Sequence, residues 1–536
     1  MADGHKTRDN YLNLFLFVIC LMIGGILSVI YRPDGSWDLQ NYHLYNAFAF
    51  IKGRFSQDLL PVGIQTYLNP ILDIPYYVTH VGALSNYAYV STFLSGLPYG
   101  ILIFLILQTA RILLPDIPRA SAWEGIAAAL IGLTGTATLS EVGTTFNDIS
   151  IAIIVIFGLN LELKSLSVSR WRGWPIGLLL GLSFGLKLTA AVYAPAALVA
   201  IMLTADGWRD AWRLGIVFCL AWWAGFLVAD GWWALALWER FRNPIFPLFN
   251  NIFHSAWAAA ASDRDSRFRP HGWLHVVFYP FYWLSGRSDL VSELPFRDAR
   301  FAASYISIVM IAVMFVVDGA KSFAGLASAC PAMAGLSSRK LRFIWIFFVI
   351  SFVFWEKMFS IIRYAVPLEV LTGFIVWTGI RLAAARFGDS RFCSGMAQGA
   401  FGVLAIAVFA TAMPMDWGRL AYGTPFVMPP VPRLGPGTTV LIVGKPLGFV
   451  LPFLDAPHAA FISIPKLPPH SPGRAFVRAR LGAGGPVSLL TNADPQGLRG
   501  LLGPYGLSVG DRACRRIRNP FGQKIELCRL SRIAPA

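Results

Sequence analysis

The chain has 536 residues, of which 56% are hydrophobic and 14% charged, and its mean hydropathy is +0.57. This composition excludes an ordinary soluble domain, in which roughly half of the residues at most are apolar. The formal net charge of +16 raises the question of a nucleic-acid partner. Much of that charge lies in short loops between apolar runs, however, so membrane topology explains it better. The first apolar run is long and many others follow it, so we expect a membrane span rather than a cleaved signal peptide.

Apolar runs of spanning length recur along the chain and predict a multi-pass α-helical membrane protein. In chain order they cover about residues 11–31, 88–110, 122–139, 148–163, 174–203, 214–237, 301–317, 342–355, 361–380 and 396–413. With the N-terminus in the cytoplasm, the basic residues Arg111, Arg119 and Lys164 fall on the cytoplasmic side. The loop TATLSEVGTTFND, which has no Lys or Arg, then falls outside.

The run 174–203 decides the topology of everything after it. As a single crossing, it would place nine later basic residues outside: Arg209, Arg213, Lys321, Arg339, Lys340, Arg342, Arg381, Arg386 and Arg391. As a helical hairpin it returns all nine to the cytoplasm, which the positive-inside rule favours. The hairpin also places Lys187 at its tip rather than at mid-bilayer, where a Lys costs about 2.5–3.5 kcal/mol. We therefore predict about eleven membrane helices, with the N-terminus inside and the C-terminus outside.

Three segments are predicted to lie outside the membrane. The first outer loop, residues 32–87, and the second, residues 238–300, contain short apolar stretches interrupted by prolines, which predict interfacial helices. The third segment is a Pro/Gly-rich linker, 414–437, followed by a small α/β domain, 438–536. In that domain TTVLIVG and PVSLLTNA are typical of buried strands, and ACRRIRNPFGQKIELCRL is typical of a hairpin that turns at NPFG.

The cysteines fall into two classes. Cys20 and Cys219 lie in apolar runs and Cys330 and Cys393 in predicted cytoplasmic loops, so we expect these four to stay reduced. The remaining two, Cys514 and Cys528, flank the predicted turn symmetrically about Phe521. In an antiparallel hairpin this symmetry can bring them face to face, so we predict a disulfide between them.

The stretch SWDLQNYHLYNAFAFIKGRF follows the first span directly and carries the first candidate site residues. Asp38 and Tyr42 share one helix face with Tyr45 or Asn46, and His43 lies beside them. A Ser or Asp here can also serve as a helix N-cap, and capping and binding can coexist.

Further candidates have ordinary structural roles as well. Asp148 opens a span and can be a cap, Lys187 can snorkel to the surface, and Glu356 and Arg363 flank a short outer loop. Arg297 and Arg300, in the second outer loop, can form local ion pairs of small energy. What these residues share is a predicted position at the outer ends of helices, where their side chains can converge.

Several segments together resemble a known superfamily. WDLQNYHLYNAF followed by YLNPILDIPYY resembles the first outer loop of the GT-C superfamily of polytopic glycosyltransferases. GLSFGLKLTA, RNPIFPLFNNIF and SIIRYAVPLEV resemble recurrent patterns of bacterial proteins of this type. The resemblance extends over roughly residues 10–413, and the C-terminal domain takes no part in it.

The resemblance implies an enzyme that transfers a sugar from a polyprenyl-phosphate carrier to an acceptor hydroxyl at the outer face of the membrane, usually with inversion. An acid of the first outer loop is the general base in this superfamily, and Asp38 occupies that position. Cations must then meet the charge that develops on the leaving phosphate. The candidates are Arg363 first, then Lys187, Arg297 and Arg300; the candidates for acceptor or sugar contacts are Tyr42, His43, Asp148 and Glu356.

Two other functions stay open. A lipid-linked saccharide polymerase or ligase would rely on Arg and His in a large outer loop, and the second outer loop contains His254, His271 and His275. A non-catalytic transporter would carry charges at mid-span and related halves. We expect no metal and no cofactor. The expected partners are the lipid-linked sugar, a glycan or lipid acceptor and membrane lipids, without nucleic acid, in the inner membrane of a bacterium.

Overall fold

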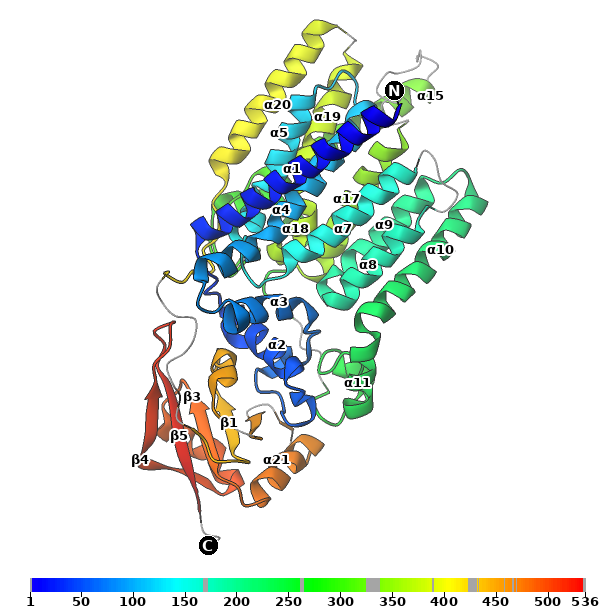
Figure 1. The fold of residues 1–536 in the computed structure, drawn as a ribbon. Helices are drawn as coiled ribbons and strands as arrows, with labels where there is room; N and C mark the ends of the chain where they lie inside the picture. Colours follow the sequence, from blue (N-terminus) through cyan, green and yellow to red (C-terminus); the bar gives the residue numbers. More distant parts are fainter. Residues whose placement is uncertain are drawn as a thin grey trace.

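The computed structural model describes residues 2–166, 172–260, 265–323, 338–387, 390–422, 431, 433–456, 458–464, 467–468 and 470–533. A helical bundle, the short helices of the first outer loop and a small sheet domain follow one another along the molecule (Figure 1). The N-terminus lies at the bundle end remote from the sheet, and the C-terminus lies at the far end of the sheet domain.

The predicted apolar runs are helical. The long helices of the bundle are α1 (Ala2–Tyr31), α4 (Ala88–Leu113), α5 (Ala122–Leu133), α7 (Asp148–Ser165), α8 (Trp174–Leu186), α9 (Tyr193–Leu203), α10 (Trp208–Phe226), α15 (Arg300–Phe323), α17 (Arg339–Met358), α19 (Thr372–Arg386) and α20 (Arg391–Thr411). After a π-helical turn at Leu227–Gly231, α10 continues into α11 (Trp232–Phe241). Large apolar side chains also cover the outside of this pair: Trp212, Leu220 and Val228 are 59%, 67% and 71% exposed. Such a face is stable against lipid and would be a liability in water.

By length and composition, four described helices can cross a membrane: Asn10–Tyr31, Ala88–Asp116, Trp208–Phe241 and Arg391–Thr411. A fifth crossing is possible if the pair Ile362–Glu369 and Thr372–Arg386, bent by 47°, counts as one span. Other apolar helices, such as α5, α8 and α9, are shorter. The prediction of a multi-pass membrane protein is therefore confirmed. The count of eleven crossings is not confirmed and stays a prediction.

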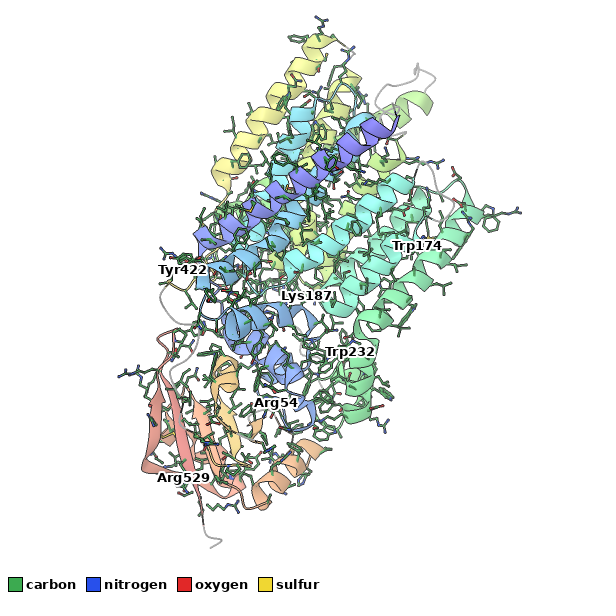
Figure 2. The ribbon with its side chains drawn as sticks, in the orientation of Figure 1. Arg54, Trp174, Lys187, Trp232, Tyr422 and Arg529 are labelled. Atoms are coloured by element: carbon green, nitrogen blue, oxygen red, sulfur yellow. A yellow bond between two sulfur atoms is a disulfide. The ribbon has the colours of Figure 1, made fainter. Side chains whose placement is uncertain are left out.

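The run 174–203 breaks at Lys187. Helix α8 ends at Leu186, Lys187 has an extended backbone (φ −151°, ψ 111°), and a 3-10 turn at Leu188–Val192 leads into α9. Lys187 lies at the bundle end that faces the first outer loop, whereas Trp174 lies toward the opposite end (Figure 2). The chain thus turns back at Lys187, as the predicted hairpin requires.

Helix α8 also packs very closely on α10. A Cβ atom added at Gly181 would lie 2.0 Å from the carbonyl oxygen of Trp222, and one at Gly225 would lie 2.1 Å from that of Leu178. Only glycine permits this approach of two helix backbones, which is a common packing device in membranes.

The first outer loop lies between the bundle and the sheet (Figure 1). It contains a π-helical turn η1 (Leu39–His43), α2 (Leu44–Ile51), 3-10 turns at Arg54–Ser56, Gly63–Tyr67 and Ile71–Asp73, α3 (Ile74–Tyr77) and a second π-helical turn at Val78–Ala83. The second outer loop contains α12 (Asn250–Phe253), α13 (Trp273–Val277) and α14 (Tyr279–Tyr282). Two short helices, α6 (Thr136–Ser140) and α18 (Val366–Glu369), precede α7 and α19.

The C-terminal domain is built on a five-stranded sheet with the order β2-β1-β3-β5-β4. The strands are β1 (Thr439–Val443), β2 (Ala460–Ser463), β3 (Val487–Thr491), β4 (Leu507–Ile517) and β5 (Ile525–Arg532), and α21 (Pro472–Gly482) is its main helix. Strand β1 is parallel to β2 and β3, and the β3–β5 and β4–β5 pairs are antiparallel. The sequence analysis predicted β1, β3 and the β4–β5 hairpin but missed β2, which is only four residues long.

Cys514 and Cys528 are register partners in the hairpin and form a disulfide with an S–S distance of 2.05 Å. Cys20, Cys219 and Cys393 are free thiols, and Cys330 lies outside the described residues.

The C-terminal domain is joined to the first outer loop by direct hydrogen bonds. The backbone of Leu59 pairs with the edge strand β2, donating to Phe461 and accepting from Ser463, at 3.0 Å each. Arg54 donates to the carbonyl oxygen of Ala459 at 2.6 Å. The domain and the first outer loop must therefore lie on the same side of the membrane.

Candidate active site

Asp38 stands at the start of η1 but does not cap it. Its side chain makes no capping hydrogen bond, and the hydroxyl of Ser36 accepts from the backbone N–H of Leu39 at 3.3 Å instead. The carboxylate of Asp38 accepts from the guanidinium of Arg363 at 3.0 Å and from the hydroxyl of Tyr42 at 3.3 Å. The acid is thus held by side chains that face the site.

Arg363 reaches Asp38 from a 3-10 turn (Ile362–Ala365) that precedes α18, 325 positions further along the chain. Its guanidinium carbon lies 4.2 Å from the ring centre of Phe146 and 5.0 Å from that of Trp417. A delocalised planar cation stacks well on such rings. The aromatic contacts fix the guanidinium, so its direction does not depend on Asp38 alone.

A second ion pair lies beside the first. The ammonium group of Lys187 donates to Asp148 and to the carbonyl oxygen of Phe146, at 2.6 Å each. It also lies 5.5 Å from the ring centre of Tyr364, the neighbour of Arg363. Phe146 therefore touches both cations, and the two ion pairs form one cluster at the bundle end next to the first outer loop.

His43 belongs to a third polar group in the same region. Its Nδ1 lies 2.7 Å from a carboxylate oxygen of Asp73, which also accepts from the side-chain amide of Asn147 at 2.9 Å. The ring of His43 packs on that of Tyr42, with 4.1 Å between ring centres. Its other nitrogen, Nε2, is buried, and no hydrogen-bond partner is seen for it among the described residues.

Two acids of the first outer loop were missed by the sequence analysis. Asp73 orients His43, and Asp34 accepts from the backbone N–H of Ser36 and from both the N–H and the hydroxyl of Thr145. The available signal was position, because both acids lie in the loop that carries Asp38. Composition alone gave no reason to prefer them.

Burial changes the chemistry of the phenol next to Asp38. Burial first, and then the negative charge of Asp38, raise the pKa of Tyr42 well above its ordinary value. Tyr42 therefore stays protonated and donates to the carboxylate. The carboxylate of Asp38 therefore has one neutral donor and one cation at its side.

Three predicted site residues make no contact with Asp38 among the described residues. Arg300 is fully buried and bonded to Asp298, which accepts from Thr136 as well. Arg297 is exposed and donates to the carbonyl oxygen of Thr411 at 3.0 Å. Glu356 is buried near the end of α17. The described contacts place neither Arg300 nor Arg297 in the cluster around Asp38, and a part for either of them in the phosphate site stays a prediction.

The helical bundle, the first outer loop and the C-terminal domain together form a multi-pass membrane protein whose overall fold is shared with solved structures. No family model and no curated protein matches the sequence. Two solved structures of ArnT from Cupriavidus metallidurans are similar to it, one bound to undecaprenyl phosphate and one in the apo state. Each has a TM-score of 0.50, and they are 15% and 14% identical. The matches cover 98% of this chain and 99% and 98% of the respective ArnT chains.

Proposed function

We propose that the protein is a membrane glycosyltransferase that moves a sugar from a polyprenyl-phosphate carrier to an acceptor hydroxyl at the outer face of a bacterial inner membrane. The observation that supports this proposal most directly is the ion pair of Asp38 with Arg363 beside Lys187. It brings together a candidate base and two cations. The similarity in fold to an ArnT structure that holds undecaprenyl phosphate supports a lipid phosphate as the donor group.

In the proposed reaction Asp38 takes the proton of the acceptor hydroxyl, and the oxygen of that hydroxyl attacks the anomeric carbon of the donor sugar. The bond from that carbon to the phosphate oxygen breaks, and the configuration at the carbon inverts. A positioned general base contributes typically about 10²–10⁴-fold. The lipid phosphate leaves with an additional negative charge, which Arg363 and Lys187 stabilise.

The remaining side chains have supporting roles in this proposal. Asp148, expected on the acceptor side, positions Lys187 through their ion pair. Tyr42 and His43 lie next to the base and are the candidates for contacts with acceptor or sugar. The absence of a metal from the reaction stays a prediction, as does the identity of the sugar.

The polymerase or ligase alternative receives no support from the histidines of the second outer loop. The ring of His275 packs on Tyr279 and Tyr282, and its Nδ1 accepts from the backbone N–H of His271 at 3.2 Å. His254 ends the short helix α12. These contacts are local, and none of the three histidines is seen in contact with Asp38 among the described residues.

The test is Asp38→Asn in the full-length protein. We expect the variant to reach the membrane and still bind undecaprenyl phosphate, but to transfer almost no sugar, because an amide cannot take the proton. Mass spectrometry of surface glycans from a deletion strain, complemented with wild type or variant, measures the transfer. Asp265→Asn, in an exposed acid of the second outer loop, is the matched control and should be neutral. Wild-type glycans with Asp38→Asn would refute the assignment of the base.

A further inference from the structure

Glu141 is a buried acid that the proposed reaction does not use. It lies between α6 and α7, is 2% exposed, and has no hydrogen-bond partner on either carboxylate oxygen among the described residues. Burying an ionised carboxylate without a partner is very costly, and the usual outcome is that the group binds a proton. A buried acid without hydrogen-bond partners therefore requires a structural or functional reason.

The loop around Glu141 is firmly fixed. Arg419 donates to the carbonyl oxygens on both sides of it, Ser140 at 2.8 Å and Val142 at 2.9 Å. Gly143 has a left-handed backbone (φ +73°), and a Cβ atom there would lie 2.0 Å from the hydroxyl of Ser28 in α1. With its neighbours clamped in this way, the side chain of Glu141 is held in the interior.

Glu141 lines a polar cavity that adjoins the candidate active site. The cavity has a volume of about 30 Å³, room for about two water molecules. Ser95, Thr144, Asn147 and Ser150 contribute hydroxyl and amide groups to its wall. Asn147 also bonds Asp73, so one residue separates the cavity from the His43 group.

The charges that face Glu141 are those of the candidate active site. Burial first, and then the negative charge of Asp148, raise its pKa well above the ordinary value; Lys187 and Arg363 oppose the shift, and Glu369 adds to it. The charge of Glu141 and the charges of the two cations thus influence one another.

We propose that Glu141 is a positioning residue that holds a proton while the donor is bound and so leaves the charge of Lys187 and Arg363 to the donor phosphate. This inference rests on the proposed function. With Glu141 neutral, Asp38 and Asp148 are the carboxylates that pair with the two cations. An ionised Glu141 adds a third carboxylate, which repels the phosphate and weakens its attraction to the cations.

This proposal fixes the direction in which the affinity for the lipid phosphate changes with pH. At low pH Glu141 is protonated and lipid binding is intact. As the pH rises through the pKa of Glu141, the group ionises and binding weakens, by at most about tenfold per pH unit. Glu141→Gln carries a neutral side chain of the same shape at every pH, so it should bind the lipid without this loss.

The experiment measures the affinity of full-length protein in nanodiscs for undecaprenyl phosphate between about pH 6 and pH 9, a range that contains little titration of ordinary carboxyls. Wild type, Glu141→Gln and Glu162→Gln are compared. Glu162 is a buried acid at the other end of α7 that accepts from the backbone N–H of Gly173, and its variant is the matched control. The phosphate titrates near pH 6 itself, but this contribution is common to all three proteins.

We expect affinity to fall with pH in wild type and in Glu162→Gln, and to stay higher in Glu141→Gln as the pH rises. Parallel curves for wild type and Glu141→Gln would overturn the inference, and so would weak binding by Glu141→Gln at every pH. If Glu141→Gln does not fold, Glu141→Met, which is neutral and needs no hydrogen bonds, carries the same expectation. Lipid binding with parallel curves refutes the role of Glu141 alone, whereas no lipid binding by any of the proteins refutes the proposed function with it.

Discussion

At the scale of single residues, the candidate active site depends on which side chains already have hydrogen-bond partners close to them in the chain. Asp38 is available to a substrate because Ser36 satisfies the helix start in its place. Arg300 is fully buried, and its Nε donates to Asp298, which lies two positions away. Two arginines predicted at the outer ends of helices thus have different partners: Arg363 pairs with Asp38 from a distant part of the chain, and Arg300 pairs with Asp298 two positions away.

Arg363 offers the most direct test of the phosphate site. We expect Arg363→Lys to lose at least about tenfold in transfer efficiency, or about 1.4 kcal/mol in transition-state free energy. A Lys is a point charge that cannot stack on Phe146 and donate to two oxygens in the geometry of a guanidinium. Arg363→Ala should lose more and also bind undecaprenyl phosphate more weakly. Transfer kinetics in nanodiscs at several donor concentrations measure both effects.

Arg297→Lys is the matched control for this experiment, because Arg297 is exposed and lies outside the cluster around Asp38. We expect it to keep nearly wild-type kinetics. If Arg363→Ala retains both lipid affinity and turnover, Arg363 is a membrane-surface anchor, and the phosphate site passes to Lys187 or Arg300.

At the scale of secondary-structure elements, ion pairs also hold the bundle together away from the site. Arg381 in α19 makes a bidentate pair with the fully buried Glu124 at the start of α5: its Nε donates to one carboxylate oxygen at 2.9 Å and its Nη2 to the other at 2.5 Å. Such a pair is a weak source of net stability, but loss of one partner typically costs about 3–5 kcal/mol. Buried charge in this chain is therefore structural by default. The candidate active site differs because its cations lie beside acids with unpaired oxygens.

The β4–β5 hairpin allows a prediction about its disulfide. Cys514 and Cys528 are separated by 14 positions, and closing a loop of this size is worth about 3 kcal/mol in the chain-entropy model. Peptide mapping without reduction, on protein from its native membrane, should find the two cysteines linked. Cys514→Ser with Cys528→Ser should make the C-terminal domain more sensitive to limited proteolysis.

Cys393, a free thiol in the bundle, supplies the control for this mapping and should be recovered unlinked. Two free thiols at Cys514 and Cys528 would contradict the prediction. They would also weaken the placement of the domain outside the cytoplasm, where disulfides persist.

At the scale of the whole molecule, contacts between the C-terminal domain and the first outer loop constrain the topology. Gln523, next to the hairpin turn, donates to Gln40 at 2.6 Å, only two positions from Asp38. Because both segments lie on one side of the membrane, the chain between them must cross an even number of times. Counting α8 and α9 as separate crossings satisfies this condition in the predicted topology, and counting them as one does not.

We therefore expect the C-terminus outside, as the loop charges predict. A C-terminal alkaline phosphatase fusion should be active and a C-terminal green fluorescent protein fusion dark. Fusions truncated after α9 should show the opposite pattern, because that point is predicted to be cytoplasmic. A fluorescent C-terminal fusion with inactive phosphatase would refute the topology and the hairpin at Lys187 with it.

The sequence by itself determined the elements. Apolar runs predicted the helices, the charge distribution predicted the turn at Lys187, and alternating or continuous apolar segments predicted β1, β3 and the β4–β5 hairpin. These features follow from periodicity and composition over a few neighbouring residues, so no tertiary information is needed. The short strand β2 escaped because four residues give little periodic signal. Its position depends on pairing with β1 and with Leu59.

Only the tertiary structure decided how the charged residues are paired. Nothing in the local sequence links Asp38 to Arg363, joins His43 to Asp73, or buries Glu141 beside Asp148. The energy of a charge depends on its depth in the protein and on the charges within a few ångströms. Both quantities are set by segments that lie far apart in the chain, so the sequence proposed the candidates and packing selected among them.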